Sequence, residues 1–86
     1  MGTNANIVVD ARGYFCPIPI IKASEAMKTL AAGGVIEVIS DDPAIEFDLP
    51  AWCESQGHRI ESHALAGDVY RYFVRKGGGM GGSARW

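Results

Sequence analysis

The sequence predicts an α/β fold: a two-layer βαβαββ sandwich whose four-stranded mixed sheet carries two helices on one face. Two short β-branched apolar runs each precede a segment in which apolar residues recur at helical spacing, and an alternating segment follows them. Helices that connect the strands of one sheet pack against it, which places both helices in one layer. The length of 86 residues, with 48% hydrophobic and 21% charged residues, fits one small folded domain.

Apolar periodicity predicts the first two strands and the first helix. Residues 7–10 read IVVD and predict a buried strand, and residues 35–40 read VIEVIS and predict a central strand. Between them, residues 17–32 predict a helix whose apolar residues at helical spacing are Ile20, Ala23, Met27, Leu30 and Ala31. Gly33 and Gly34 tolerate the left-handed backbone that ends many helices and are expected to stop this one.

A second helix is expected after the central strand, in DDPAIEFDLPAWCESQG. Asp41 or Asp42 can cap it and Pro43 suits its first position, and apolar residues keep the helical period up to the closing glycine. Pro50 falls inside this segment, where a proline deletes a helical hydrogen bond and clashes with the preceding turn. We therefore expect a kink at Pro50, or a short turn followed by a restart that Asp48 caps.

The last third of the chain predicts a β-hairpin. Apolar and polar residues alternate on both sides of the turn sequence AGD, which gives strands at 58–65 and 69–76. The second strand should present two faces, one with Tyr70, Tyr72 and Val74 and the other with Arg71, Phe73 and Arg75. The expected organisation is one domain over residues 1–78 and a flexible glycine-rich tail over residues 79–86.

Charge and composition argue against several classes of protein. The net charge of −2 is spread over mixed-sign residues without a basic stripe, so no direct nucleic-acid partner is expected. No apolar run approaches the roughly 20 residues that span a bilayer, and the N-terminal segment lacks a signal-peptide pattern. We therefore expect no membrane partner and a cytoplasmic location. A domain of this size leaves little room for a buried organic cofactor, and none is expected.

Cys16 stands between a glycine-led turn and two prolines, in ARGYFCPIPIIKASEAM. If Cys16 is the N-cap of the first helix, Pro17 and Pro19 take the first and third helical positions, whose amides have no helical partner. A thiolate there faces the positive end of the helix dipole, can accept from the Ile18 amide, and has Arg12 upstream. These features predict a lowered pKa and a reactive thiol; the alternative is a buried, inert cysteine.

The remaining cysteine and the histidines have structural interpretations. Cys53 lies on the periodic apolar face of the second helix and is expected in the core. Two cysteines this far apart, without a paired motif, argue against a zinc site and against a disulfide framework, so no metal is expected. His58 and His63 have no partner at ligand spacing and are expected to pack at the surface or across strands.

Three stretches resemble the small sulfur-carrier proteins of the TusA (SirA-like) family: VDARGYFCPIPIIKASEAM, DDPAIEFDLPAWCESQGH and YRYFVRKGG. The resemblance covers residues 7–78, and its pattern D-x-R-G-x-x-C-P-x-P, followed by D-D-P and D-x-P-x-W-C, is highly specific. It implies the same βαβαββ sandwich and a persulfide of sulfane sulfur on Cys16. In the family, the donor is often a cysteine desulfurase or a rhodanese-like protein. Acceptors belong to tRNA thiolation, molybdenum-cofactor formation or sulfur oxidation.

A sulfur carrier must expose its sulfur on a rigid element that two different proteins can reach. Cys16 is the persulfide-bearing residue in this interpretation, and Arg12 and the helix amides can stabilise the anionic terminal sulfur. The supporting residues are Arg12, Gly13, Pro17, Ile18 and Pro19. The expected docking contacts are Tyr14 and Phe15 and, if their loop sits beside the thiol, Asp41 and Asp42.

The leading hypothesis is a monomeric sulfur carrier that is not an autonomous enzyme and that works between a donor protein and an acceptor sulfurtransferase. Two other classes stay open. A thiol-based redox or regulatory module would form mixed disulfides through Cys16. A nucleic-acid-binding domain would use the interleaved aromatic and basic residues of YRYFVRK.

Overall fold

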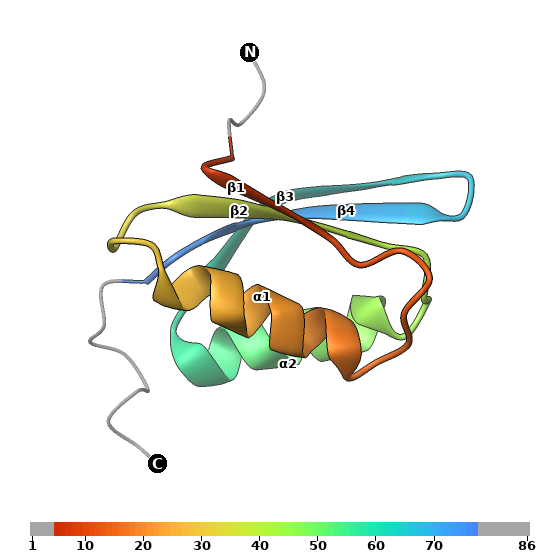
Figure 1. Cartoon of the computed structure of the whole chain (residues 1–86), viewed down its shortest axis with the longest axis horizontal. Helices are drawn as coiled ribbons and strands as arrows, with labels where there is room; N and C mark the ends of the chain where they lie inside the picture. The colour runs from red at the N-terminus through yellow and green to blue at the C-terminus, as the bar shows by residue number, and fades with distance from the viewer. Residues whose placement is uncertain (1–4, 78–86) are drawn as a thin grey trace.

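The computed structural model describes residues 5–77 and has the predicted element order βαβαββ (Figure 1). Its elements are β1 (Ile7–Asp10), α1 (Ile18–Lys28), β2 (Val35–Ser40), α2 (Ile45–Gln56), β3 (Arg59–Ala66) and β4 (Val69–Arg75). The expected glycine-rich tail lies outside the described residues. None of the helices within residues 5–77 is both long and apolar enough to cross a membrane.

The four strands form one mixed sheet in the order β1-β2-β4-β3, with both helices on one face (Figure 1). Strand β1 runs parallel to β2, and the other two neighbouring pairs are antiparallel. The predicted two-layer sandwich is therefore confirmed. The prediction that β1 is buried is wrong: it is an edge strand in which Val9 is buried and Val8 is 57% exposed, because within residues 5–77 no second layer covers the other face of the sheet.

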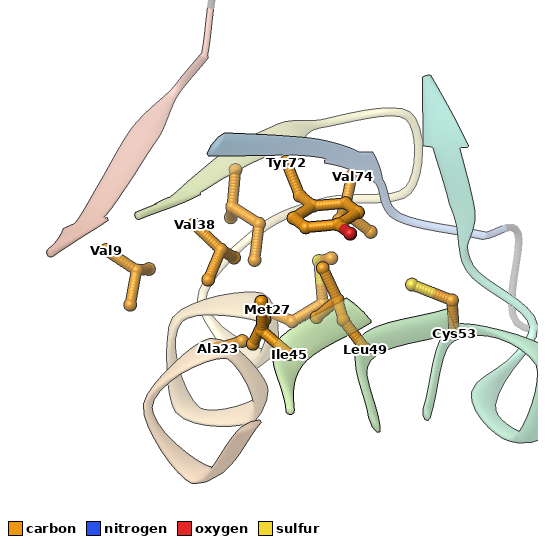
Figure 2. Close-up of a cluster of buried hydrophobic side chains, with 10 residues drawn as sticks. Val9, Ala23, Met27, Val38, Ile45, Leu49, Cys53, Tyr72 and Val74 are labelled. Carbon is orange, nitrogen blue, oxygen red and sulfur yellow. The ribbon is translucent and has the colours of Figure 1, made fainter. Parts of the chain in front are cut away.

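The core lies between the sheet and the two helices (Figure 2). Each helix contributes a row of side chains at helical spacing, and β2 and β4 contribute alternate residues from the face that the helices cover. The buried apolar cluster consists of Val9, Ala23, Met27, Ile36, Val38, Ile45, Leu49, Cys53, Tyr72 and Val74. The prediction that Cys53 belongs to the core is confirmed, since its side chain is 3% exposed.

Helix α1 begins one residue later and ends four residues earlier than the predicted range 17–32. Its last turn tightens, because the amides of Thr29 and Leu30 donate to carbonyls three residues back, at N–O distances of 3.1 and 3.2 Å. Gly33 follows with a φ of +90°, a conformation that glycine adopts without strain. The two glycines thus shape the turn into β2, and α1 has already ended at Lys28.

Helix α2 runs without interruption through Pro50, so the predicted restart capped by Asp48 is wrong. Leu49 and Cys53, on the two sides of Pro50 in the chain, are 0% and 3% exposed, and their packing holds the helix in register across the missing hydrogen bond. Asp42 does cap the turn that leads into α2: its Oδ1 accepts from the Ala44 amide at 3.1 Å. The helix ends at Gln56 and is capped by Gly57, the closing glycine expected from the sequence.

The hairpin of β3 and β4 agrees with the prediction to within one residue at each strand end. The expected alternation is confirmed: Tyr72 and Val74 are buried, while Arg71 and Arg75 are exposed and form ion pairs with acidic residues. The histidines pack as expected, His63 stacked on Tyr72 at 5.4 Å and His58 against Trp52 at 5.0 Å between ring centroids.

Candidate functional site

The loops that follow β1 and β2 lie together at the carboxyl ends of these two parallel strands. The pairing of β1 with β2 continues one residue beyond the strand, because the Ala11 amide donates to the Ile39 carbonyl at 2.7 Å. In open α/β sheets this edge is the usual place for a functional site. The first loop carries Cys16, and the second carries Asp41 and Asp42.

Two aspartates of the second loop hold the backbone of the Cys16 loop. The Gly13 amide donates to Asp41 Oδ1 at 3.0 Å, and the Cys16 amide donates to Asp42 Oδ2 at 2.9 Å. Buried Ser40 fixes the second loop in turn, because its Oγ accepts from the Asp42 amide at 3.1 Å. The loop of Asp41 and Asp42 therefore lies beside Cys16, which the sequence analysis required for a docking role of these two residues. Their most evident role is to position the backbone around the thiol.

Cys16 is not the N-cap of α1. Pro17 takes that position, Ile18 is the first helical residue, and Pro19 is the second and is buried. The Ile18 amide donates to the Phe15 carbonyl at 3.0 Å, so a turn ahead of the helix has already used it. The prediction that this amide stabilises a Cys16 thiolate is therefore wrong, since the amide points into the turn.

Arg12 also differs from the prediction, because its guanidinium pairs with Asp10. Nε and Nη2 of Arg12 donate to the two carboxylate oxygens of Asp10 at 2.9 and 2.8 Å, and both side chains are about half exposed. These bonds lower the pKa of Asp10 to about 2. In this arrangement the cation that was expected to support the thiolate is already engaged.

The Cys16 side chain is half-buried, and its pKa is raised to about 12 rather than lowered. Burial is the largest cause, followed by the carboxylates of Asp48 and Asp42 beside the thiol. The predicted lowering of the Cys16 pKa is therefore wrong for the free protein, in which these surroundings favour the protonated thiol. Sequence reasoning assigned Asp48 only to capping, because its place beside Cys16 is a tertiary contact that local sequence does not indicate.

Large apolar side chains beside Cys16 in the chain and at the start of α2 are open to solvent. Tyr14 and Phe15, the expected docking contacts, are 46% and 77% exposed, and the Nζ of Lys22 lies 4.7 Å from the Tyr14 ring centroid. Sequence reasoning missed Phe47, which is 75% exposed on the first turn of α2. The sequence could have indicated this exposure, because Phe47 lies outside the helix face that the apolar period assigns to the core.

The arrangement suits the exchange of a group between Cys16 and another protein. The thiol stands on a loop whose Gly13 and Cys16 amides are held by Asp41 and Asp42, and it is reachable from solvent. The second free thiol, Cys53, is buried in the core, and burial raises its pKa to about 12. Within residues 5–77 there is no cluster of three metal-ligating side chains.

Replacing Asp48 by asparagine is expected to speed alkylation of Cys16 at neutral pH roughly threefold to tenfold. The change removes one of the two carboxylates that disfavour the thiolate, so the pKa of Cys16 falls toward the usual thiol value of about 8.5. Rates of iodoacetamide modification against pH, followed by intact mass, measure this effect. For the wild type, the alkylation rate should keep rising as the pH passes the usual thiol pKa of about 8.5.

The matched control is Glu54→Gln, which removes an exposed carboxylate from the same helix away from the thiol. It should leave the alkylation rate of Cys16 unchanged. A wild-type rate that levels off below the usual thiol pKa, or equal rates in Asp48→Asn and the wild type, would contradict the account of the acidic surroundings.

Comparisons with known proteins show which family this chain belongs to. The family model "Sulfurtransferase TusA" matches residues 7–76. The sequence is 37% identical to the putative sulfur carrier protein YrkI of Bacillus subtilis over 81% of this chain and 93% of that protein. It is 45% identical to the putative sulfur carrier protein YrkF of the same organism, over 86% of this chain but only 40% of YrkF. The sulfur carrier protein TusA of Pseudomonas putida strain W619 is 35% identical over 80% of this chain and 86% of its own length.

A solved structure supports the same relationship. The crystal structure of a SirA-like protein from Desulfitobacterium hafniense superposes with a TM-score of 0.73 at 32% identity, over 83% of this chain and 97% of that one. The family match therefore extends over the whole βαβαββ sandwich, including both loops of the site. From this agreement of sequence and fold, we conclude that the chain belongs to the TusA family of sulfur carrier proteins.

Proposed function

We propose that this protein accepts sulfane sulfur as a persulfide on Cys16 and passes it to an acceptor protein. The observation that carries the proposal is the solvent-reachable Cys16 thiol on a loop that Asp41 and Asp42 hold in place, in a member of a sulfur carrier family. The sulfur donor is a cysteine desulfurase or a rhodanese-like protein, and the acceptor is a sulfurtransferase. The carrier itself is not an autonomous enzyme, and we place it in the cytoplasm as a monomer.

The transfer is an exchange between two sulfur atoms with no net oxidation. The Cys16 sulfur attacks the terminal sulfur of the donor persulfide, a new S–S bond forms on Cys16, and the donor's old S–S bond breaks to release its thiolate. The proton of the Cys16 thiol passes to a base of the donor or to water. Transfer to the acceptor repeats the same step, with the Cys16 sulfur as the leaving group.

The raised pKa of Cys16 favours a division of roles between the carrier and its partners. A protonated thiol is a weak nucleophile, so Cys16 resists alkylation and oxidation while the carrier is free. The donor must then supply the base or the cation that activates it. The recipient pathway, whether tRNA thiolation, molybdenum-cofactor formation or sulfur oxidation, is set by the acceptor that docks.

Incubation with a cysteine desulfurase and cysteine, or with a rhodanese and thiosulfate, is expected to add the mass of one sulfur atom to the wild type. Cys16→Ser should gain nothing, because the attacking sulfur is absent. Cys53→Ser is the matched control and should load as the wild type does, since Cys53 is buried. Intact-mass analysis reports the gain, and a reducing agent should reverse it.

The competing hypothesis, a thiol-based redox module, predicts a different product in the same experiment. It would give a mixed disulfide with the mass of the whole partner instead of a single added sulfur atom. No gain of sulfur with either donor would overturn the proposed function.

A further inference from the structure

Two adjoining hollows lie between α1 and α2, and side chains of both helices line them. On α1, Ile20, Ser24 and Lys28 follow one another at intervals of four residues and form one row. On α2, Trp52 and Gln56 have the same spacing. Figure 1 shows that both helices end on the same side of the molecule, opposite the loop before α1. The smaller hollow lies on that side, because Lys28 and Gln56 are the last residues of the two helices.

The smaller hollow, of about 150 Å³, is lined by groups that donate hydrogen bonds or carry positive charge. Its polar lining side chains are Ser24, Lys28, Gln56, His58 and Lys76. No carboxylate of the described residues lines it. Within residues 5–77 neither lysine forms an ion pair, and the Lys76 ammonium uses one of its three donors on the Leu30 carbonyl. The lining therefore favours a negatively charged group.

His58 is held in this lining by its neighbours. Its Nδ1 accepts from the Gly77 amide at 3.1 Å, and its ring packs against Trp52 at 5.0 Å between centroids. A Cβ at position 77 would collide with the Gly57 carbonyl, so only glycine allows this close approach of the chain. Because Nδ1 accepts, the neutral ring carries its proton on Nε2, which is then a donor. Burial lowers the pKa of His58, and the charge of Lys76 lowers it further.

The larger hollow, of about 390 Å³, continues between the helices and offers apolar surface. Ile21 is 47% exposed there, and Ile20 and Trp52 are half-buried. Glu25 also lines this hollow, so a negatively charged group is disfavoured in it. A ligand with an anionic head and an apolar body therefore fits in one direction, with its head in the smaller hollow. The two volumes together fall within the range of about 300–1,000 Å³ that is typical of small-molecule sites.

We propose that the two hollows form a binding site for a small organic anion, a carboxylate that carries an aromatic or aliphatic body. Lys28, Lys76 and His58 hold the carboxylate, and the body packs on Ile21 and Trp52. The positive lining selects an anion, the apolar surface of the larger hollow selects an apolar body, and the volume selects a small molecule. Neither hollow includes the reactive thiol, so this site is separate from the proposed sulfur transfer.

Titration of the full chain with phenylbutyrate, followed by NMR, tests this site. The signals of the His58 ring and the Trp52 indole should shift in a saturable way, while those of the His63 ring, which lines neither hollow, should stay in place. The uncharged phenylbutanamide should bind about tenfold more weakly, because it cannot form charge-assisted hydrogen bonds with the lysines. Bound phenylbutyrate should also raise the pKa of His58, since its negative charge opposes the effect of Lys76.

Variants of the lining separate this site from non-specific binding. Lys28→Gln is expected to weaken phenylbutyrate binding about fivefold, and Ile21→Ala about threefold. Lys22→Gln, on the same helix, and Val8→Ala are the matched controls, because neither residue lines the two hollows.

Three results would overturn the inference. The first is the absence of saturable shifts with phenylbutyrate, and the second is equal binding of phenylbutyrate and its amide or equal losses in the controls. The third is an acidic peptide that shifts the His58 and Trp52 signals where phenylbutyrate does not, which would assign the hollows to a protein partner.

Discussion

Replacing Leu49 by alanine is expected to lower the free energy of unfolding by about 3 kcal/mol. Leu49 is fully buried between the sheet and the helix layer (Figure 2). The truncation loses the transfer free energy of the buried methyl groups and leaves a cavity that the neighbouring strands can only partly fill. The residue also stands directly before Pro50, where α2 lacks a hydrogen-bond donor and depends on packing for its continuity.

Urea unfolding followed by circular dichroism measures this loss. Domains of this size are stable by only about 5–10 kcal/mol, so the shift of the midpoint should be large. The control is Leu65→Ala on β3, where the side chain is 55% exposed and the cost should stay below about 0.5 kcal/mol. Equal costs for the two leucines would contradict the assignment of Leu49 to the core.

Replacing Asp42 by alanine is expected to lower the free energy of unfolding and to loosen the Cys16 loop. The Asp42 carboxylate accepts from the amides of Cys16 and Ala44 at 2.9 and 3.1 Å, and both bonds are partly buried. Without it, two amides lose their partner and the turn before α2 loses its cap. Hydrogen exchange should show faster exchange at the Cys16 and Ala44 amides, with β4 unchanged.

The same bonds predict how Asp42 links stability to pH. The amide donors lower the pKa of Asp42 in the folded protein below that of the unfolded carboxyl, which is about 3.9. Its contribution to stability is therefore fully present above that value and is lost as the pH falls through the folded pKa. Asp42→Ala should flatten this part of the stability profile. A variant as stable as the wild type at neutral pH, or with the same acid profile, would contradict this role.

Much of the fold could be predicted from the sequence because its signals are local. Apolar period, glycine positions and the AGD turn predict the elements without knowledge of their neighbours. The errors arise where tertiary contacts decide. Strand β1 is apolar but lies at an edge of the sheet, and α2 continues through Pro50 because the buried residues on both sides of it pack in the core.

The candidate site was predicted in part. Local sequence indicated Cys16, the exposed Tyr14 and Phe15, and the neighbouring loop of Asp41 and Asp42. The pKa of Cys16 could not be predicted in the same way, because it depends on burial and on Asp48, which another helix brings to the thiol. The closeness of Arg12 to Cys16 in the sequence also led to a wrong prediction about the partner of its guanidinium.

Arg12 illustrates that point. It lies four residues before Cys16 in the chain, yet its guanidinium forms two hydrogen bonds with Asp10. The carboxylate on the adjacent strand end offers a bidentate partner at close range, which a thiol cannot match. Sequence proximity therefore gave the correct loop but the wrong partner for this cation.

The central claim is that Cys16 carries the sulfur, and peptide mapping of the loaded wild-type protein tests it most directly. After incubation with the protein donor and rapid trapping of persulfides, digestion and tandem mass spectrometry locate the added sulfur atom. Our account predicts that the sulfur is found on the peptide with Cys16 and that Cys53 stays unmodified. Sulfur on Cys53, or a Cys16 peptide that gains no sulfur while the donor is active, would contradict the account.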